Sequence, residues 1–511
     1  MTVLHLNQAA ALQSNLQKRN EEYIMKKKFF TALIATVVLC VSVFAGCAPR
    51  EYEHKTTIDN PWWTTTGSLD KDSNGKVVYD NVTISLNTVV GGRDYAALME
   101  MIGEFHDSHP GITVSVSNNI ADENYGTQIP QNILNDINAP DLLMAHQKWY
   151  KNFAELKIIQ PFDETLEAMG TTIDTGDYSA TLSEYSDCGY PGYLFSVPMD
   201  GQSIVVLYNK TLMDKYELKI PTTHAELISV CDTVAKGENI VPIAWSFNET
   251  NRFFEKYAWP TCLAQNGVKF YDEHDGKPYR ATWASDAENM KAVKDGIQSM
   301  RDFITHSPTI AKSDMGDSGA ATAFINDKYL FYFVVPWDVS SALANYKNTY
   351  NLSDDALRKR VGATSMAGWF ALDPTNENAE TIFGDSHFFA MSKTVTDITK
   401  KAAICEFVKW MTQTTSAGVK WAEAGHINAC TAVATDPVYM QNDFVATYMS
   451  KFYPDINNFR SVGTTPYYNV TFSELMALMS AVVTNSTAAQ DEASIRLVED
   501  NVNMQIDLAE M

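Results

Sequence analysis

Residues 187–227 read DCGYPGYLFSVPMDGQSIVVLYNKTLMDKYELKIPTTHAEL and predict a strand followed by a helix. Residues 203–208 (SIVVLY) form an uninterrupted apolar run with several β-branched side chains, which is typical of a buried strand. Thr223 stands three residues before Glu226, the spacing of a capping box at the start of a helix. The stretch therefore indicates a strand–helix unit of the kind that builds α/β folds.

A strand–helix–strand pattern lies closer to the N-terminus. Residues 82–86 (VTISL) and 112–116 (ITVSV) both have the β-branched character of strands. Between them, residues 95–105 place four apolar side chains at the i, i+3, i+4 and i+7 spacing of an amphipathic helix. A strand, a helix and a second strand in this order predict a βαβ unit, and hence a parallel sheet.

Several short motifs follow one another in a particular order. They are HPGI at 109–112, APD at 139–141, GYLFSVPMD at 192–200, VLYNK at 206–210 and PTT at 221–223. This order resembles the extracellular solute-binding lipoproteins of bacterial ABC importers, in the carbohydrate-binding, maltose-binding-protein-like family. The resemblance implies an α/β, periplasmic-binding-protein-like fold of two lobes, with three interlobe crossings and a ligand cleft between the lobes.

The resemblance also implies how the chain is divided. We expect the crossings near residues 198–201, 385–391 and 427–432. The expected parts are an upstream extension that is not a domain (1–24), a lipoprotein signal peptide (25–46), a flexible tether (47–80), an N-terminal lobe (81–198 and 389–430) and a C-terminal lobe (199–388 and 431–511).

The signal-peptide prediction depends on residues 25–47, MKKKFFTALIATVVLCVSVFAGC. Three lysines precede an apolar run that ends in Ala-Gly-Cys, the pattern of a bacterial lipoprotein signal, in which Cys47 carries the lipid. The family pattern usually has leucine three residues before the cysteine, and this chain has Phe44. A plain secretory signal with an incidental cysteine is the alternative. The prediction places the protein on the outer face of the cell membrane.

Composition excludes some classes of protein and site. The 511-residue chain has a net charge of −23. Because nucleic-acid binding needs clustered lysine and arginine, this charge argues against nucleic acid as a partner. Five cysteines follow Cys47 at wide spacings, an odd number without a CxxC motif or a Cys/His cluster at zinc spacing: Cys188, Cys231, Cys262, Cys405 and Cys430. We therefore expect no dense disulfide framework, no metal site and no cofactor.

Candidate ligand-binding residues follow from the chemistry of sugars. A sugar ring has apolar faces, on which aromatic rings stack, and hydroxyl groups, to which charged and amide side chains form hydrogen bonds. Side chains of these kinds near strand ends or expected crossings are Trp337, Asp200, Trp369, Trp245, Trp259, Asp338, Asp385, His146, Gln147 and Arg93.

We expect a monomer that captures an oligosaccharide or glycoside by hinge closure and delivers it to an ABC permease, without catalysis. One alternative is a binding protein for a peptide or a polyamine. Another is a cell-surface enzyme that uses Asp338 and Asp385 as a glycosidase acid and base. The sequence has no G-x-S-x-G, HExxH or phosphate-binding glycine motif. A lipoprotein adhesin or scaffold that transports nothing is a third alternative.

Overall fold

The computed structural model describes residues 56–236, 241–244, 254–271, 280–307, 324–452, 456–460, 468–483 and 487–510. Contacts divide the chain into two units, Met1–Glu53 and His54–Met511, and all of the described residues belong to the second. None of the helices formed by these residues is both long enough and apolar enough to span a membrane.

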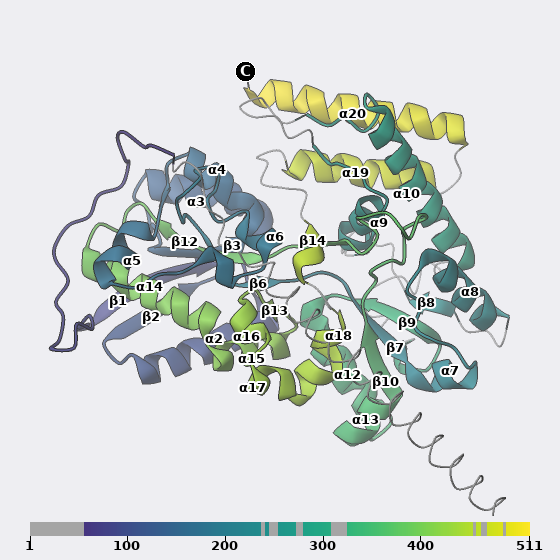
Figure 1. Ribbon diagram of the computed structural model, residues 1–511, viewed down its shortest axis with the longest axis horizontal. Helices are drawn as coiled ribbons and strands as arrows, with labels where there is room; N and C mark the ends of the chain where they lie inside the picture. Colours follow the sequence, from purple (N-terminus) through teal and green to yellow (C-terminus); the bar gives the residue numbers. More distant parts are fainter. Residues whose placement is uncertain are drawn as a thin grey trace, which may run out of the picture. The chain divides into compact units, whose positions relative to one another are not determined.

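A six-stranded sheet forms the core of the first lobe (Figure 1). Its order is β2-β1-β3-β12-β4, and β5 also pairs with β12. The strands are β1 (Val82–Thr88), β2 (Ile112–Ser117), β3 (Leu142–His146), β4 (Ile159–Gln160), β5 (Val197–Pro198) and β12 (His387–Ser392). Strand β1 runs parallel to β2 and β3, whereas β12 runs antiparallel to β3. The parallel pairing predicted for the first βαβ unit is confirmed.

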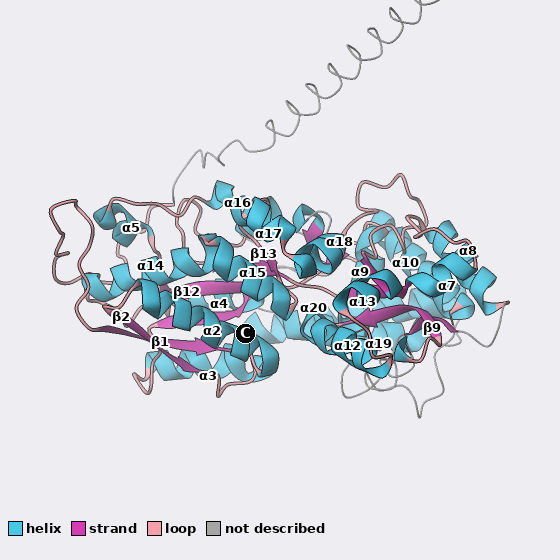
Figure 2. Cartoon of the chain, turned by 90° about the horizontal axis from the view of Figure 1, so that it is seen from below, coloured by secondary structure: helices cyan, strands magenta, loops and turns pink. Residues whose placement is uncertain are grey.

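Helices cover both faces of this sheet. Figures 1 and 2 show the sheet between α3 on one side and α14 on the other. The helices and turns of this region are α2 (Gly92–Ser108), α3 (Asp122–Leu134), η1 (Gln147–Trp149), α4 (Tyr150–Glu155), α5 (Asp163–Met169), η2 (Thr175–Asp177), α6 (Ala180–Ser183), α14 (Ile398–Gln413) and α15 (Thr415–Ala424). The four apolar side chains that predict α2 are all buried. They face α14 and α15, with which α2 is in contact.

A four-stranded sheet forms the core of the second lobe. Its order is β10-β7-β9-β8, and the strands are β7 (Val205–Asn209), β8 (Val241–Ala244), β9 (Tyr329–Val334) and β10 (Val361–Thr364). The apolar run of the opening stretch becomes β7, a central strand between β9 and β10. As predicted, Thr223 caps a helix, α8 (His224–Ala235): its side chain accepts a hydrogen bond from the backbone N–H of Glu226.

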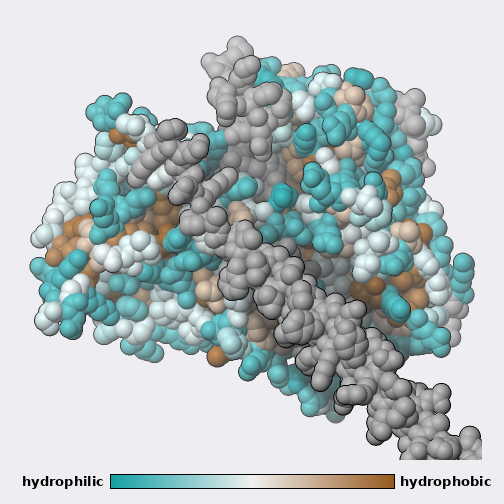
Figure 3. All heavy atoms as spheres, viewed as in Figure 1, coloured by the Kyte–Doolittle hydropathy of each residue, from teal (hydrophilic) through white to brown (hydrophobic). Residues whose placement is uncertain are grey.

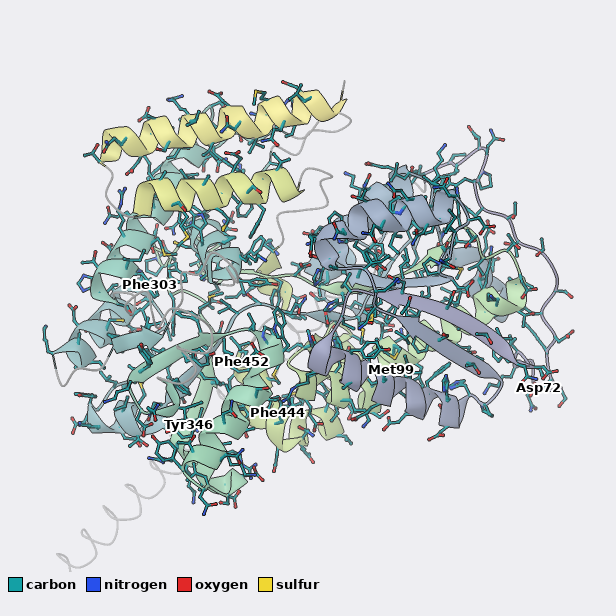
Figure 4. All side chains as sticks on the ribbon, turned by 180° about the vertical axis from the view of Figure 1, so that it is seen from behind. Asp72, Met99, Phe303, Tyr346, Phe444 and Phe452 are labelled. Atoms are coloured by element: carbon teal, nitrogen blue, oxygen red, sulfur yellow. The ribbon has the colours of Figure 1, made fainter. Side chains whose placement is uncertain are left out.

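The helices of the second lobe pack around this sheet and beyond it. They are α7 (Lys210–Lys215), α8 (His224–Ala235), η3 (Phe254–Ala258), α9 (Trp259–Gln265), α10 (Ala287–His306), α12 (Pro336–Thr349), α13 (Asp354–Arg360), α16 (Thr431–Ala434), α17 (Pro437–Gln441), η5 (Val445–Met449), α18 (Ser450–Phe452), η6 (Ile456–Asn458), α19 (Tyr468–Val483) and α20 (Ala488–Glu510). Phe303 of α10, labelled in Figure 4, packs edge-on against Phe333 of β9 and Phe370. These aromatic contacts fix α10 against the sheet.

The three segments predicted as crossings lie side by side. Strand β6 (Asp200–Gly201) pairs with β13 (Ile427–Asn428), and Gln202 forms a bridge with Asp385 just before β12. A further two-stranded pairing joins β11 (Ile382–Phe383) to β14 (Phe459–Arg460). Short backbone ladders thus connect the chain segments that run between the two main sheets.

Residues 56–80 lie along the first lobe. The Trp62 indole donates a hydrogen bond to the carbonyl of Ile159 (2.8 Å) and stacks on Phe195. Lys401 of α14 donates to the carbonyl of Thr64 (2.9 Å). These contacts place Trp62 and Thr64, within the segment expected as a tether, on the lobe. Residues 47–55 of that segment lie outside the described residues.

One face of the described surface is mainly hydrophilic, and the described cysteines lie in the core. On the face shown in Figure 3, hydrophilic residues predominate and hydrophobic residues form separate patches. The five cysteines beyond Cys47 are all buried and form no disulfide, so each acts as a small apolar core residue.

Candidate ligand-binding site

A cavity of about 600 Å³ lies where elements of both lobes meet the crossing segments. From the first lobe it receives the turn after β1, the start of α2 and the end of β3. From the second lobe it receives the first two turns of α12. Its lining residues are Val89, Val90, Gly91, Gly92, Arg93, Asp94, His146, Gln202, Trp337, Asp338, Ser341 and His387.

The secondary structure explains why these side chains reach the cavity. The lining segments follow the carboxyl ends of β1, β3 and β9, and ligands of open α/β sheets bind beyond those ends. Pro336 begins α12 directly after β9, which places Trp337 and Asp338 in the first turn of the helix. Both side chains are half-buried, so part of each is exposed at the cavity wall.

One hydrogen bond crosses the cavity from lobe to lobe. Arg93, in the first turn of α2, donates from Nη2 to the Oγ of Ser341 on α12 (2.9 Å). These two side chains thus connect α2 and α12 directly. Closure of the lobes is favoured by such contacts, because they form only when the two helices are close.

Removing this link should weaken ligand retention. The Ser341→Ala variant loses an exposed hydrogen bond to a charged group, which contributes about 1 kcal/mol, so we expect affinity to fall about 3- to 5-fold. Most of the loss should appear as faster dissociation in stopped-flow measurements. Thr349→Ala, on the same helix but bonded only within it, is the control and should leave dissociation unchanged. Equal rates for Ser341→Ala and the unmodified chain would contradict the role of the link.

A chain of ionisable side chains borders the cavity on the first lobe. His146 Nδ1 lies 3.0 Å from Asp122 Oδ1 and 3.7 Å from Asp385 Oδ2, and Lys148 pairs with Asp122 at 2.6 Å. Burial opposes charge on His146, but the neighbouring Asp385 and Asp122 carboxylates outweigh it and raise the pKa of the imidazole. Burial is likewise outweighed at Asp122, where His146 and Lys148 hold the pKa of the carboxyl well below its usual range. The two carboxylates thus favour the protonated form of His146 at the cavity wall.

Asp200 lies behind the cavity and joins the three crossings. It is fully buried, and its carboxylate accepts hydrogen bonds from the backbone N–H of His387 (2.7 Å), from His387 Nδ1 (2.8 Å) and from Trp421 Nε1 (2.7 Å). His426 Nδ1 is 3.3 Å away. Burial opposes ionisation of Asp200, but the interactions with His387 and His426 outweigh it and lower the pKa of the carboxyl to about 2. The group is therefore a carboxylate at neutral pH.

A glycine makes this arrangement possible at the end of α15. Gly425 has a positive φ of 115° and its Cα lies against the carbonyl of Pro336 at the start of α12. A Cβ at this position would collide with that backbone. Glycine thus lets α15 end against α12 and directs the next residue, His426, toward Asp200.

The structure brings four of the predicted residues together at the cavity: Arg93, His146, Trp337 and Asp338. None of the other predicted residues that the structure describes lines this cavity. Gln147 and Asp385 line a second, much smaller cavity. Asp200 is buried behind the first cavity, whereas Trp245 and Cys47 lie outside the described residues.

Two predicted tryptophans belong to the core of the second lobe. Trp259 and Trp369 are fully buried, and their indole N–H groups donate to the carbonyls of Leu475 (3.0 Å) and Pro221 (2.8 Å). A ring enclosed on all sides and bonded internally offers no face to a ligand. The sequence alone could not predict that these two tryptophans are buried, because tryptophan occurs both in protein cores and on the walls of sugar sites.

The sequence analysis did not select Asp94, Gln202, Ser341, His387 or His426. Gln202 and His387 are within or next to the expected crossings, and His426 directly precedes the third. Taking every polar side chain within or directly beside the three crossings as a candidate would have found these three. Ser341 gives no such signal, since only the packing of α12 against α2 brings it to the cavity.

Two α/β lobes, joined by adjacent crossings with a cavity between them, define a two-lobe binding-protein fold. The chain belongs to the bacterial extracellular solute-binding protein family, whose sequence profile matches residues 91–418.

Solved structures share this fold at low sequence identity. The sugar-binding protein MalE from Xanthomonas citri is 16% identical with a TM-score of 0.65, covering 84% of this chain and 100% of that chain. The GacH receptor of Streptomyces glaucescens GLA.O is 17% identical with a TM-score of 0.61 (84% and 99%). UgpB from Mycobacterium tuberculosis is 14% identical with a TM-score of 0.60 (84% and 99%). No curated protein matches this chain in sequence.

Proposed function

We propose that this protein is a lipid-anchored extracellular binding protein that captures an oligosaccharide or glycoside and delivers it to an ABC permease. The observation that carries the proposal is the cavity wall at the start of α12, where Trp337 stands beside Asp338 in a cavity that Arg93 and His146 also line. An aromatic ring beside charged hydrogen-bonding groups suits a sugar, which has apolar faces and hydroxyl edges. The cavity volume is within the range of small-molecule sites.

The solved relatives support a sugar ligand without identifying it. GacH has been described in complex with acarbose, and MalE3 of T. maritima with maltose. UgpB, of the same fold, is in complex with glycerophosphocholine, so the fold also accepts other solutes. The choice of sugar for this chain therefore depends on its own cavity residues.

Hinge closure is the proposed mechanism of capture. The proposed N-terminal lobe comprises residues 81–198 and 389–430, and the C-terminal lobe comprises residues 199–388 and 431–511. A ligand that contacts α2 of one lobe and α12 of the other favours the closed arrangement. The permease would recognise that closed form, and the protein would act as a monomer.

Ligand binding is tested by thermal unfolding of the protein with mono- and oligosaccharides. At a ligand concentration one hundred times Kd, binding should add about 2.7 kcal/mol to the free energy of unfolding and raise Tm. Recovery of intact sugar after incubation supports binding without catalysis, whereas cleaved sugar supports the glycosidase alternative. A Tm shift with peptides or polyamines but with no sugar would contradict the proposed ligand class.

The glycosidase alternative receives no support from the positions of its two carboxylates. Asp338 lines the large cavity and Asp385 the small one. Asp385 is also close to His146, at 3.7 Å. The family and the solved relatives are binding proteins. We therefore propose binding without catalysis.

Lipid attachment at Cys47 is tested separately from ligand binding. The Cys47→Ser variant should move the protein from the membrane fraction to the medium and abolish incorporation of radiolabelled palmitate. Cys40→Ser, within the apolar part of the signal, is the matched control and should leave both unchanged. Retention of label in Cys47→Ser would show that the lipid is attached elsewhere.

A further inference from the structure

Three buried side chains from the three crossings form a cluster behind the large cavity, and one of them, Asp200, is a ligand contact predicted from the sequence. Asp200 comes from β6, His387 from β12 and His426 from the residue before β13, and their relative exposures are 0%, 3% and 0%. One donor atom from each lies within 4.8 Å of the others. Asp200 Oδ2 lies 2.8 Å from His387 Nδ1 and 3.3 Å from His426 Nδ1. Such separations allow the atoms to share one cation, because metal–nitrogen and metal–oxygen bonds are about 2.0–2.2 Å long and two of them span at most about 4.4 Å.

The charge balance of the cluster leaves negative charge without a fixed partner. Asp200 forms ion pairs only with His387 and His426, and Asp94 only with His426, among the ion pairs of the described residues. Asp122, by contrast, has the permanent cation of Lys148 beside it. A carboxylate removed from water needs a compensating charge, and a cation bound by the cluster would supply one.

His426 has the unsatisfied donor atoms that a cation requires. Neither of its ring nitrogens forms a hydrogen bond of acceptable geometry with the described residues, although the side chain is fully buried. Buried polar atoms are almost always bonded, so this exception needs an explanation. Nδ1 faces Asp200 at 3.3 Å, and Nε2 faces Asp94 at 3.2 Å.

We propose that Asp200, His387 and His426 bind one divalent transition-metal cation of the zinc class, which would displace the proton between His387 Nδ1 and Asp200. Two imidazoles and one carboxylate are a donor set that suits Zn²⁺. Asp94 would orient the His426 ring from its other nitrogen, as carboxylates do for metal-bound histidines. Trp421, which donates to Asp200 and stacks on His426 with a centroid distance of 4.4 Å, would hold both ligands in place.

The position of the cluster gives the cation a structural consequence. Because each ligand comes from a different crossing, one cation would join all three segments at the hinge. His387 also lines the large cavity, so the cation would lie directly behind the ligand site. The sequence predicts no metal site here, since its ligands are far apart along the chain and follow no metal-binding spacing.

The test is metal binding by the full chain, purified in detergent and treated with a chelator. Titration with ZnCl₂ in a calorimeter should show one Zn²⁺ per chain, and the cation should raise Tm. His426→Gln should lose this binding. His306→Gln is the matched control, because it removes a histidine that pairs with Asp232 on the surface (2.5 Å) and should leave the binding unchanged.

Co²⁺ gives a second measurement that needs no variant. Co²⁺ in the unmodified chain should give the visible absorption of a site with nitrogen and oxygen ligands, and Zn²⁺ should displace it. Absence of stoichiometric binding would overturn the proposal and leave the cluster as a purely hydrogen-bonded junction of the three crossings. Equal Zn²⁺ binding by His426→Gln and the unmodified chain, or loss of binding in His306→Gln, would also overturn it, by assigning the cation to the surface.

Discussion

The Trp369→Ala variant is expected to lose about 3–5 kcal/mol of its free energy of unfolding while keeping its ligand affinity. Deleting a large aromatic side chain from a packed core has a cost of this size, because apolar burial is lost and a cavity remains. The Trp369 ring packs edge-on against Phe331 (5.0 Å) and Phe333 (6.0 Å) of β9. Its N–H group also holds Pro221, just before α8. The variant therefore removes a contact between the sheet and the segment that leads into α8.

Urea unfolding measures the loss, and calorimetry on the folded fraction measures ligand affinity. Trp369→Phe is the intermediate variant: it keeps most of the apolar volume but loses the hydrogen bond to Pro221, so it should be destabilised less than alanine. A Trp369→Ala variant of unchanged stability and reduced affinity would contradict the core assignment. That result would instead make Trp369 the ligand contact that the sequence suggests.

The elements that the sequence predicts best are those with a local pattern. The amphipathic spacing of α2, the β-branched runs of β1, β2 and β7, and the cap of α8 are each determined by neighbours within a few residues. Residues with these patterns bury one face or satisfy one helix end in almost any context. Their arrangement into two lobes was predicted from the resemblance to a known family, which rests on the order of the motifs.

The hinge and the cavity wall depend on contacts between distant residues. Strands β6 and β13 are two residues long each, too short for any periodic pattern, and they exist because they pair with one another. Asp200 was predicted to contact ligand, but its fully buried position follows from His387 and Trp421, which lie far along the chain. The sequence shows that such groups are polar and near crossings, not which way they point.

The Trp337→Ala variant is expected to lose ligand affinity while retaining its stability, the reverse of Trp369→Ala. The side chain is partly exposed at the cavity wall, so its removal leaves no enclosed void, and alanine is the residue that best favours a helix. If a sugar stacks on this ring, the contact is the aromatic anchor of the site. Loss of such an anchor costs about 2 kcal/mol or more, an affinity decrease of about 30-fold.

Calorimetric titration with the sugar identified by thermal unfolding measures this decrease, with Trp337→Phe expected to retain part of the affinity. Phe444→Ala is the matched control, because Phe444 (labelled in Figure 4) is another half-buried aromatic residue, placed after β13, that does not line the cavity. Phe444 packs on Tyr448 at 5.5 Å, so its loss should cost some stability and no affinity. If both variants bind the sugar as tightly as the unmodified chain, the ligand does not contact the start of α12. The cavity would then have to bind its ligand through the polar groups of the first lobe, among them Arg93 and His146.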